Sequence, residues 1–170
     1  MGQWRTRITQ ALVVCSLAAP NGATAQQGSS PPDRPVGMDL AVQACLDSAV
    51  GPLVAQARRS FPGFAQKFEA GLPQGYTPSV TVRLTDNSGH FEQVFVTVDS
   101  IRHESIYGRV TSRIELVRGY KFGQPIRVSE SEILDWTISR PDGTEEGNLL
   151  GKYMDALAER LRRNPQRKPC

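Results

Sequence analysis

The sequence contains little cysteine and histidine, and little excess charge of either sign. Among its 170 residues there are three cysteines and two histidines, and 20 basic side chains against 17 acidic ones give a formal net charge of +3. Three cysteines exclude a small domain held together by many disulfides and a zinc ribbon built on several cysteines. A net charge of +3 is too small for a dedicated nucleic-acid-binding protein, so we expect no nucleic-acid partner.

Motifs that mark common catalytic and nucleotide-binding sites are missing as well. The chain has no Gly-x-Ser-x-Gly nucleophile elbow, no phosphate-binding glycine loop, no His-Glu-x-x-His helix and no paired-cysteine metal knuckle. No cysteine or serine stands in a pattern that would activate it as a nucleophile. We therefore predict no catalytic residue, no bound metal and no cofactor, and the sequence favours a protein without enzymatic activity.

Residues 1–25 have the order of a secretory signal peptide. Arg5 and Arg7 precede an apolar run from Ala11 to Ala19, and Ala23-Thr24-Ala25 offers small residues to a signal peptidase. The apolar run is far shorter than the ~20 residues that a membrane-spanning helix needs. We predict Sec-type export with cleavage near Ala25, a periplasmic or secreted product, and no transmembrane segment.

The cysteines leave several possibilities open. Cys15 could be acylated, but the bulky Val14 before it argues against lipoprotein processing. Once the leader is removed, Cys45 and Cys170 could form one disulfide in an oxidising compartment. We favour a buried, unpaired Cys45 on a helix and a Cys170 that is free or paired with another molecule.

The mature chain has room for one domain. Residues 26–37 are rich in proline, glycine and serine and predict a flexible linker, followed by a single domain over residues 38–163 and a basic tail over 164–170. Apolar residues recur at helical spacing from Leu40 to Val54, and Gly51-Pro52 predicts two helices or one kinked helix there. A second break at Phe61-Pro62-Gly63 precedes a short helical turn from Phe64 to Ala70.

The periodicity changes to that of β-strands after Pro78. Alternating residues predict strands at 80–84 and 91–98, paired as a hairpin across the turn at 86–89, and further short strands at 105–110, 125–129 and 135–139. These predict an antiparallel, strongly bent β-meander, which could curl into a half-barrel.

A closing helix completes the predicted α+β domain, in which N-terminal helices and one C-terminal helix flank the sheet. Asn148 can cap this helix, and Leu150, Tyr153 or Met154, Leu157 and Leu161 form an apolar stripe that we expect to lie across one face of the sheet.

The strand region resembles the domain-of-unknown-function family 2314 over roughly residues 50 to 150. The resemblance lies in Glu92, Phe95 and Val96; Tyr107, Gly108 and Val110; Gly123 and Val128; Glu132, Ile133, Asp135 and Trp136; and Asp142-Gly143 with Gly147. The family's second strand often reads Glu-His-x-Trp-Val, whereas this chain has Gln93 and Phe95, which removes a histidine that could act as a general base. The resemblance implies a fold and a bacterial setting but no reaction.

Four residues are candidates for binding a polar ligand: Glu92, Glu132, Asp135 and Trp136. A carboxylate beside an indole at the rim of a sheet suits such a ligand. We favour the structural alternative, in which Ser129 or Ser131 caps a turn, Asp135 accepts backbone hydrogen bonds and Trp136 fills the core.

A metal site is a weaker possibility. His90, Glu92, His103 and Glu104 lie close in sequence, but a complete strand separates the two histidines. We therefore expect solvated histidines.

The end of the chain is basic. Arg160, Arg162, Arg163, Arg167 and Lys168 lie within the final eleven residues, among which there is no acid. They could make weak contact with anionic lipid headgroups or another polyanion. For the helical residues we favour pairing with the helix dipole.

These observations predict an exported, non-catalytic binding or interaction module whose partner is an envelope protein or a polar ligand. The alternative is a hydrolase of an envelope substrate that uses Glu92, Glu132 or Asp135 as acid or base. Clustering of these carboxylates in one cleft would favour the enzyme, and their dispersal would favour the binding module. Oligomeric state does not follow from the sequence.

Overall fold

The computed structural model describes residues 40–166, with backbone alone for residues 40–43. The elements are α1 (Leu40–Glu69), β1 (Thr77–Thr85), β2 (Phe91–Arg102), β3 (Ser105–Val110), β4 (Pro125–Ser129), a 3₁₀ turn η1 (Glu130–Glu132), β5 (Ile133–Ser139), β6 (Glu145–Gly147) and α2 (Leu149–Arg163). The predicted signal peptide, the linker and the end of the basic tail lie outside the described residues.

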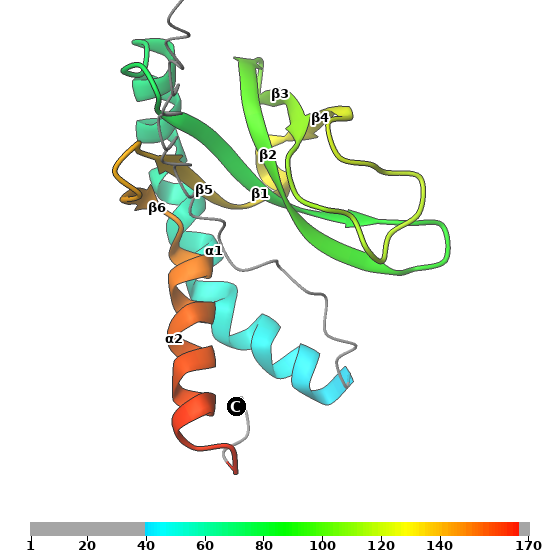
Figure 1. The fold of residues 1–170 in the computed structure, drawn as a ribbon. Helices are drawn as coiled ribbons and strands as arrows, with labels where there is room; N and C mark the ends of the chain where they lie inside the picture. Colours follow the sequence, from blue (N-terminus) through cyan, green and yellow to red (C-terminus); the bar gives the residue numbers. More distant parts are fainter. Residues whose placement is uncertain (1–39, 167–170) are drawn as a thin grey trace, which may run out of the picture.

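The strands form one antiparallel sheet in the order β4-β3-β2-β1-β5-β6 (Figure 1). This confirms the α+β prediction, and β1 to β4 follow one another as a meander. The meander does not continue into β5, which pairs with β1 and not with β4. The reason is burial: most residues of β5 are buried on both faces, which suits a strand in the interior of a sheet.

The sheet is strongly bent. Three strands lie between β4 and β5 in the sheet, yet only the three residues of η1 connect these two strands along the chain. Such a short connection can span the sheet only if the sheet curls, and register shifts in β1 and β2 assist the bending. The sheet stays open, with β4 and β6 at its edges.

Helix α1 runs without interruption through both predicted breaks, so of the two alternatives at Gly51-Pro52 the one with two helices is wrong, as is the separate helical turn predicted after Pro62. Pro52 and Pro62 lie inside the helix on its exposed side. A proline inside a helix costs about 3 kcal/mol, but Ala57, Phe61 and Phe64 are fully buried against the sheet. Their packing holds the helical conformation that the local sequence disfavours.

The two helices differ in how they meet the sheet. Residues of α1 pack on the sheet, where the Phe64 ring lies 5.4 Å from the Trp136 ring. Helix α2 lies beside α1 and touches the sheet at β5 (Figure 1), so the prediction that it crosses a face of the sheet is wrong. Leu150 and Leu157 are its buried residues, and Asn148 caps it as predicted, accepting a hydrogen bond from the Gly151 N–H.

Cys45 also differs from its prediction. Its side chain is half-buried and disulfide-bonded, so it is not an unpaired core thiol. An apolar helical neighbourhood accommodates a thiol and a disulfide equally well, so the residues around Cys45 could not show that it is disulfide-bonded. Cys170 and Cys15 lie outside the described residues.

Candidate functional site

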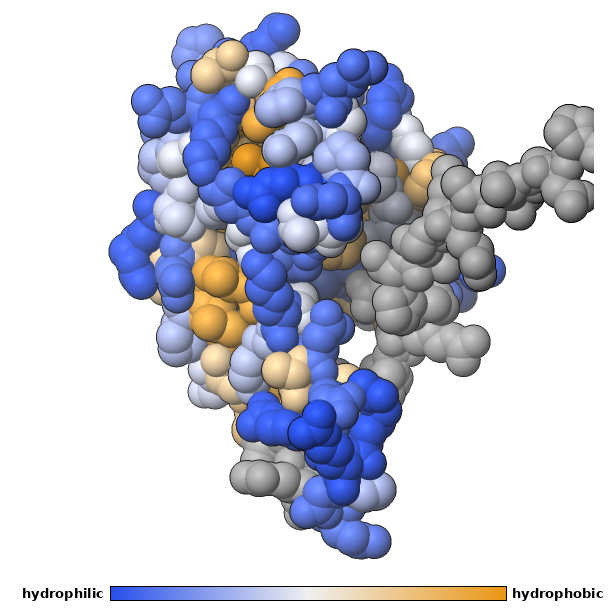
Figure 2. All heavy atoms as spheres, turned by 60° about the vertical axis from the view of Figure 1, so that its left-hand side comes forward, coloured by the Kyte–Doolittle hydropathy of each residue, from blue (hydrophilic) through white to orange (hydrophobic). Residues whose placement is uncertain are grey.

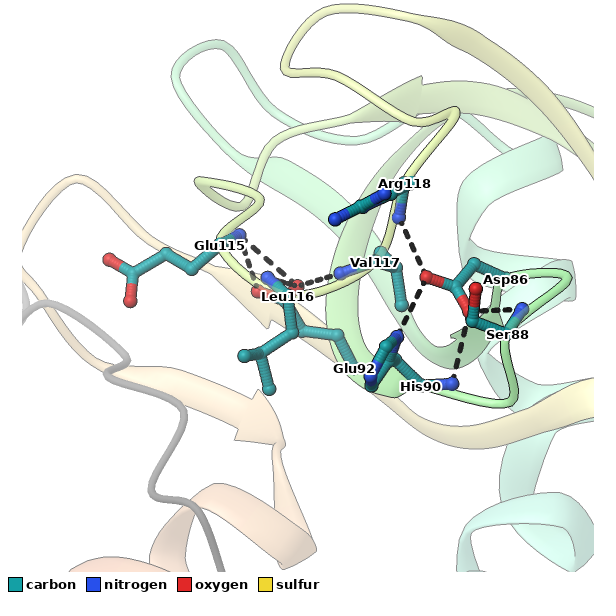
Figure 3. Close-up of polar contacts among 8 residues, drawn as sticks. All are labelled: Asp86, Ser88, His90, Glu92, Glu115, Leu116, Val117 and Arg118. Carbon is teal, nitrogen blue, oxygen red and sulfur yellow. Dashed lines mark hydrogen bonds and ion pairs between the residues drawn. The ribbon is translucent and has the colours of Figure 1, made fainter.

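Glu92, a predicted binding residue, holds a loop. It lies on β2 with 8% of its surface exposed. Its carboxylate accepts hydrogen bonds from the backbone N–H groups of Glu115, Leu116 and Val117, with N to O distances of 3.0 to 3.4 Å (Figure 3). These three residues belong to the connection between β3 and β4, so the charge of Glu92 is satisfied by backbone.

Asp86, which the sequence indicated only as a turn residue, holds the same loop. Its carboxylate accepts hydrogen bonds from the N–H groups of Arg118, Ser88 and His90, and it lies 3.2 Å from the His90 Nδ1 (Figure 3). Loss of hydration raises its pKa, but the backbone bonds led by Arg118 outweigh this and lower the pKa to about 2. We call Asp86 and Glu92 the carboxylate clamp.

Asp135 and Trp136 have the structural roles that the sequence favoured. The Asp135 side chain is fully buried and accepts hydrogen bonds from the N–H of Trp136 at 2.8 Å and of Leu150 at 2.7 Å. Burial raises the pKa of Asp135, and the bonds from α2 and Trp136 partly oppose that rise. The Trp136 side chain is buried, and its indole N–H donates to the Ser60 hydroxyl at 2.9 Å, at the edge of the core where Ser60 is exposed.

Glu132 lies elsewhere, at the end of β4. Its carboxylate accepts a hydrogen bond from the Ser129 N–H, and the Ser129 hydroxyl accepts one from the Ser131 N–H, so Ser129 caps η1 as predicted. The three candidate carboxylates, Glu92, Glu132 and Asp135, thus serve the β3–β4 loop, η1 and the start of α2 respectively. They share no bonding partner.

A polar pocket of about 390 Å³ opens beside Glu132, at the end of the sheet where β3 begins and β4 ends. It is lined by His103, Glu104, Ser105, Arg127, Ser129 and Glu132. We call it the rim pocket. Of the four predicted binding residues it contains Glu132.

The turn between β2 and β3 supplies two residues of the rim pocket in an unusual conformation. His103 and Glu104 have φ angles of 47° and 59°. Two-residue hairpin turns favour such angles but usually place Asn and Gly there, because a left-handed conformation costs other residues about 1–2 kcal/mol each. Strain of this kind is concentrated at functional sites.

Arg127 is a residue of this pocket that the sequence did not indicate. Its Nε and one terminal nitrogen donate to the Ser105 hydroxyl at 3.1 and 3.0 Å, and its guanidinium carbon lies 5.9 Å from the centre of the Tyr107 ring. Within residues 40–166 it forms no ion pair. A fixed guanidinium without a carboxylate partner can bind an anionic group.

The histidines lie on the surface. His90 and His103 are both exposed, as predicted. In the part of the chain that the structure describes, no group of three or more His, Cys, Asp or Glu residues could hold a metal ion. Within the same residues, no helix has the length and apolarity needed to cross a bilayer.

At the basic end of α2 two arginines pair with an acid of the same helix, whereas pairing with the helix dipole stays a prediction. Arg162 and Arg163 form ion pairs with Glu159, which lies about one turn earlier in the helix. The Arg163 Nε lies 2.7 Å from the carboxylate. The lower end of the molecule, where α2 ends, is strongly hydrophilic (Figure 2). Arg160 is exposed there, and Arg167 and Lys168 lie outside the described residues.

One comparison with known proteins gives a match. A family described as "Uncharacterized protein conserved in bacteria (DUF2314)" matches residues 47–167. No curated protein and no solved structure matches the chain.

Proposed function

The chain belongs to the DUF2314 family, and from this premise we propose that it is an exported, non-catalytic binding protein of the cell envelope that holds a small polar ligand with an acidic group in the rim pocket. The observation that carries the proposal is Arg127. Its guanidinium is oriented by Ser105 and lines a polar pocket without an ion-pair partner among residues 40–166.

The chemistry of the lining defines the ligand class. Arg127 presents a fork of N–H donors that fits a carboxylate or a phosphate. Ser129 adds a hydroxyl, and His103 adds an imidazole ring with one donor and one acceptor nitrogen. Glu104 has the opposite charge to Arg127, and its carboxylate suits a hydroxyl or amino group elsewhere on the same ligand.

The carboxylates support a role without catalysis. Glu92 and Asp135 are buried and bonded to backbone N–H groups, away from the rim pocket. Glu132 lines the pocket but bonds to the backbone of Ser129. The hydrolase alternative requires carboxylates among Glu92, Glu132 and Asp135 to act together on one substrate, and the dispersal of these three carboxylates gives it little support.

Export rests on residues 1–25 and is tested separately. We expect protein recovered from the periplasmic fraction of a producing bacterium to begin at Gln26 by N-terminal sequencing. An intact N-terminus and a cytoplasmic fraction would contradict export without bearing on the rim pocket.

Binding is tested with two simple probes, succinate and inorganic phosphate. We expect either anion to shift the amide resonances of Ser105 and Arg127 in NMR spectra of the ¹⁵N-labelled protein, and Arg127→Gln to abolish the shifts. Arg109→Gln is the matched control, because Arg109 is an exposed arginine on β3, the neighbouring strand, and pairs with Asp99. Equal loss in both variants, or shifts spread over the surface, would contradict the proposal.

A further inference from the structure

The connection between β3 and β4, residues 111–124, exposes apolar side chains. Leu116 has 44% and Phe122 69% of its surface exposed. Other apolar residues of this loop point inward: Val117 is buried, and Ile114 and Tyr120 pack against the core. Val117, Ile114 and Tyr120 therefore anchor the loop to the core, whereas Leu116 and Phe122 face solvent.

This loop is held in place. The carboxylate clamp binds four successive backbone N–H groups, from Glu115 to Arg118 (Figure 3). The base of the loop is closed by hydrogen bonds from the Val110 N–H to the Gln124 carbonyl and from the Gly123 N–H to the Val110 carbonyl. Leu116 and Phe122 are thus kept in solvent by an ordered backbone.

The same loop carries basic side chains close in sequence to Leu116 and Phe122. Arg113, Arg118 and Lys121 are all exposed, and Glu115 is the one acid in the loop. Within the described residues, the ion pair among these charges is a long one, 3.9 Å between Arg113 and Glu115. Exposed aromatic and aliphatic side chains interleaved with cations are the combination that binds the interface of an anionic bilayer.

We infer that the β3–β4 loop docks on the surface of a membrane that contains anionic lipid, with Phe122 and Leu116 at the headgroup boundary and the three basic side chains over the headgroups. A bilayer accepts separate apolar insertions, whereas a protein partner would need a groove shaped to both. The rim pocket lies at the other end of β3 and β4, where Ser105 pairs with Ser129. Docking through the loop leaves that pocket facing away from the membrane.

The test is co-sedimentation of the purified protein with vesicles. We expect binding to vesicles of equal parts phosphatidylglycerol and phosphatidylcholine, little binding to phosphatidylcholine alone, and a loss of binding at high salt. Phe122→Ser should weaken the partition coefficient at least about fivefold. Arg118→Gln with Lys121→Gln should weaken it by roughly fivefold for each charge and reduce its salt dependence.

Met154→Ser is the matched control, because Met154 is also an exposed apolar residue, at 41%, but lies on α2. It should leave vesicle binding unchanged, and unaltered melting temperatures should show that each variant folds. The inference is overturned if the protein does not bind anionic vesicles, or if Met154→Ser and Phe122→Ser lose binding equally. It is also overturned if binding is lost when Arg160, Arg162 and Arg163 are replaced but kept when the loop residues are replaced.

Discussion

The carboxylate of Glu92 can be changed without changing its shape, by Glu92→Gln. The acid accepts N–H groups on both of its oxygens, Oε1 from Glu115 and Oε2 from Glu115, Leu116 and Val117. Glutamine keeps one accepting oxygen and places an NH₂ group at the other position. With the remaining oxygen at the Oε2 position, the three N–H groups keep an acceptor but lose its charge, and the NH₂ group faces the Glu115 N–H as donor against donor.

The magnitude follows from the change from a charged acceptor to a neutral one. A hydrogen bond to a charged acceptor contributes about 1.5–3 kcal/mol and a neutral one about 0.5–1.5 kcal/mol. Leu116 and Glu115 are exposed, so water can replace part of the loss there, whereas Val117 is buried. We therefore expect Glu92→Gln to lower the free energy that keeps the loop closed by about 1–3 kcal/mol.

Limited trypsin digestion reports on this free energy directly, because Arg113, Arg118 and Lys121 are cleavage sites within the loop. When the loop opens and closes faster than it is cut, the cleavage rate follows the open population. A loss of 1–3 kcal/mol then raises cleavage at these sites roughly 5- to 150-fold. Urea unfolding monitored by Trp136 fluorescence measures the global change alongside.

Glu115→Gln is the matched control, since it removes a carboxylate from the same loop whose ion pair with Arg113 is long and exposed. Such a pair contributes about 0–1 kcal/mol, so cleavage should change little. If Glu92→Gln and Glu115→Gln are cut at the same rate as the unchanged protein, Glu92 does not hold the loop. An increase in cleavage outside residues 111–124 alone would refute the reasoning equally.

Three further predictions concern the rest of the fold. Burial raises the pKa of Asp135 above its ordinary value of 3.8, so between the two pKa values the folded state binds more protons than the unfolded state. The free energy of unfolding should therefore fall as the pH rises through that window. Asp135→Asn should lack this fall in urea melts, and the same pH dependence in both proteins would contradict the prediction. Gly147→Ala places a Cβ 2.2 Å from the Trp136 carbonyl oxygen at a φ of +76° and should cost about 2–4 kcal/mol, whereas Gly143→Ala, at +81° in open space, should cost only about 1–2 kcal/mol in the same melts. Reduction of the disulfide at Cys45 should lower stability by about 2–4 kcal/mol, and an unchanged melting temperature in reductant would contradict a stabilising role.

Local patterns predicted the strands well where each pattern reports on a half-buried surface. The predicted ranges 105–110 and 125–129 match β3 and β4, and the turn at 86–89 joins β1 to β2. Separate helices were predicted as one alternative for α1 because the sequence shows the cost of Pro52 and Pro62 but not the packing of Phe61 and Phe64 that outweighs it. The short strand β6 was missed because its three residues, Glu145 to Gly147, carry no alternation.

The candidate site was less accessible to sequence reasoning. A carboxylate in a sequence shows its charge but not its acceptor bonds, so Glu92 and Asp135 looked available although backbone N–H groups surround them. Arg127 and the turn at His103 and Glu104 meet only because β2, β3 and β4 pair in register. The sequence did not indicate that turn, because the predicted strand ended at residue 98, whereas β2 continues to Arg102 and leaves two residues before β3.

By itself the sequence determined the fold class, the family, most strand positions and the capping roles of Ser129 and Asn148, because each is recorded in patterns of residues that are neighbours along the chain. The tertiary structure alone decided the pairing of β5 with β1, the continuity of α1, the clamp on the β3–β4 loop and the rim pocket. These depend on contacts between residues far apart in sequence, whose free energies are set by burial and by hydrogen-bond partners that no local pattern records.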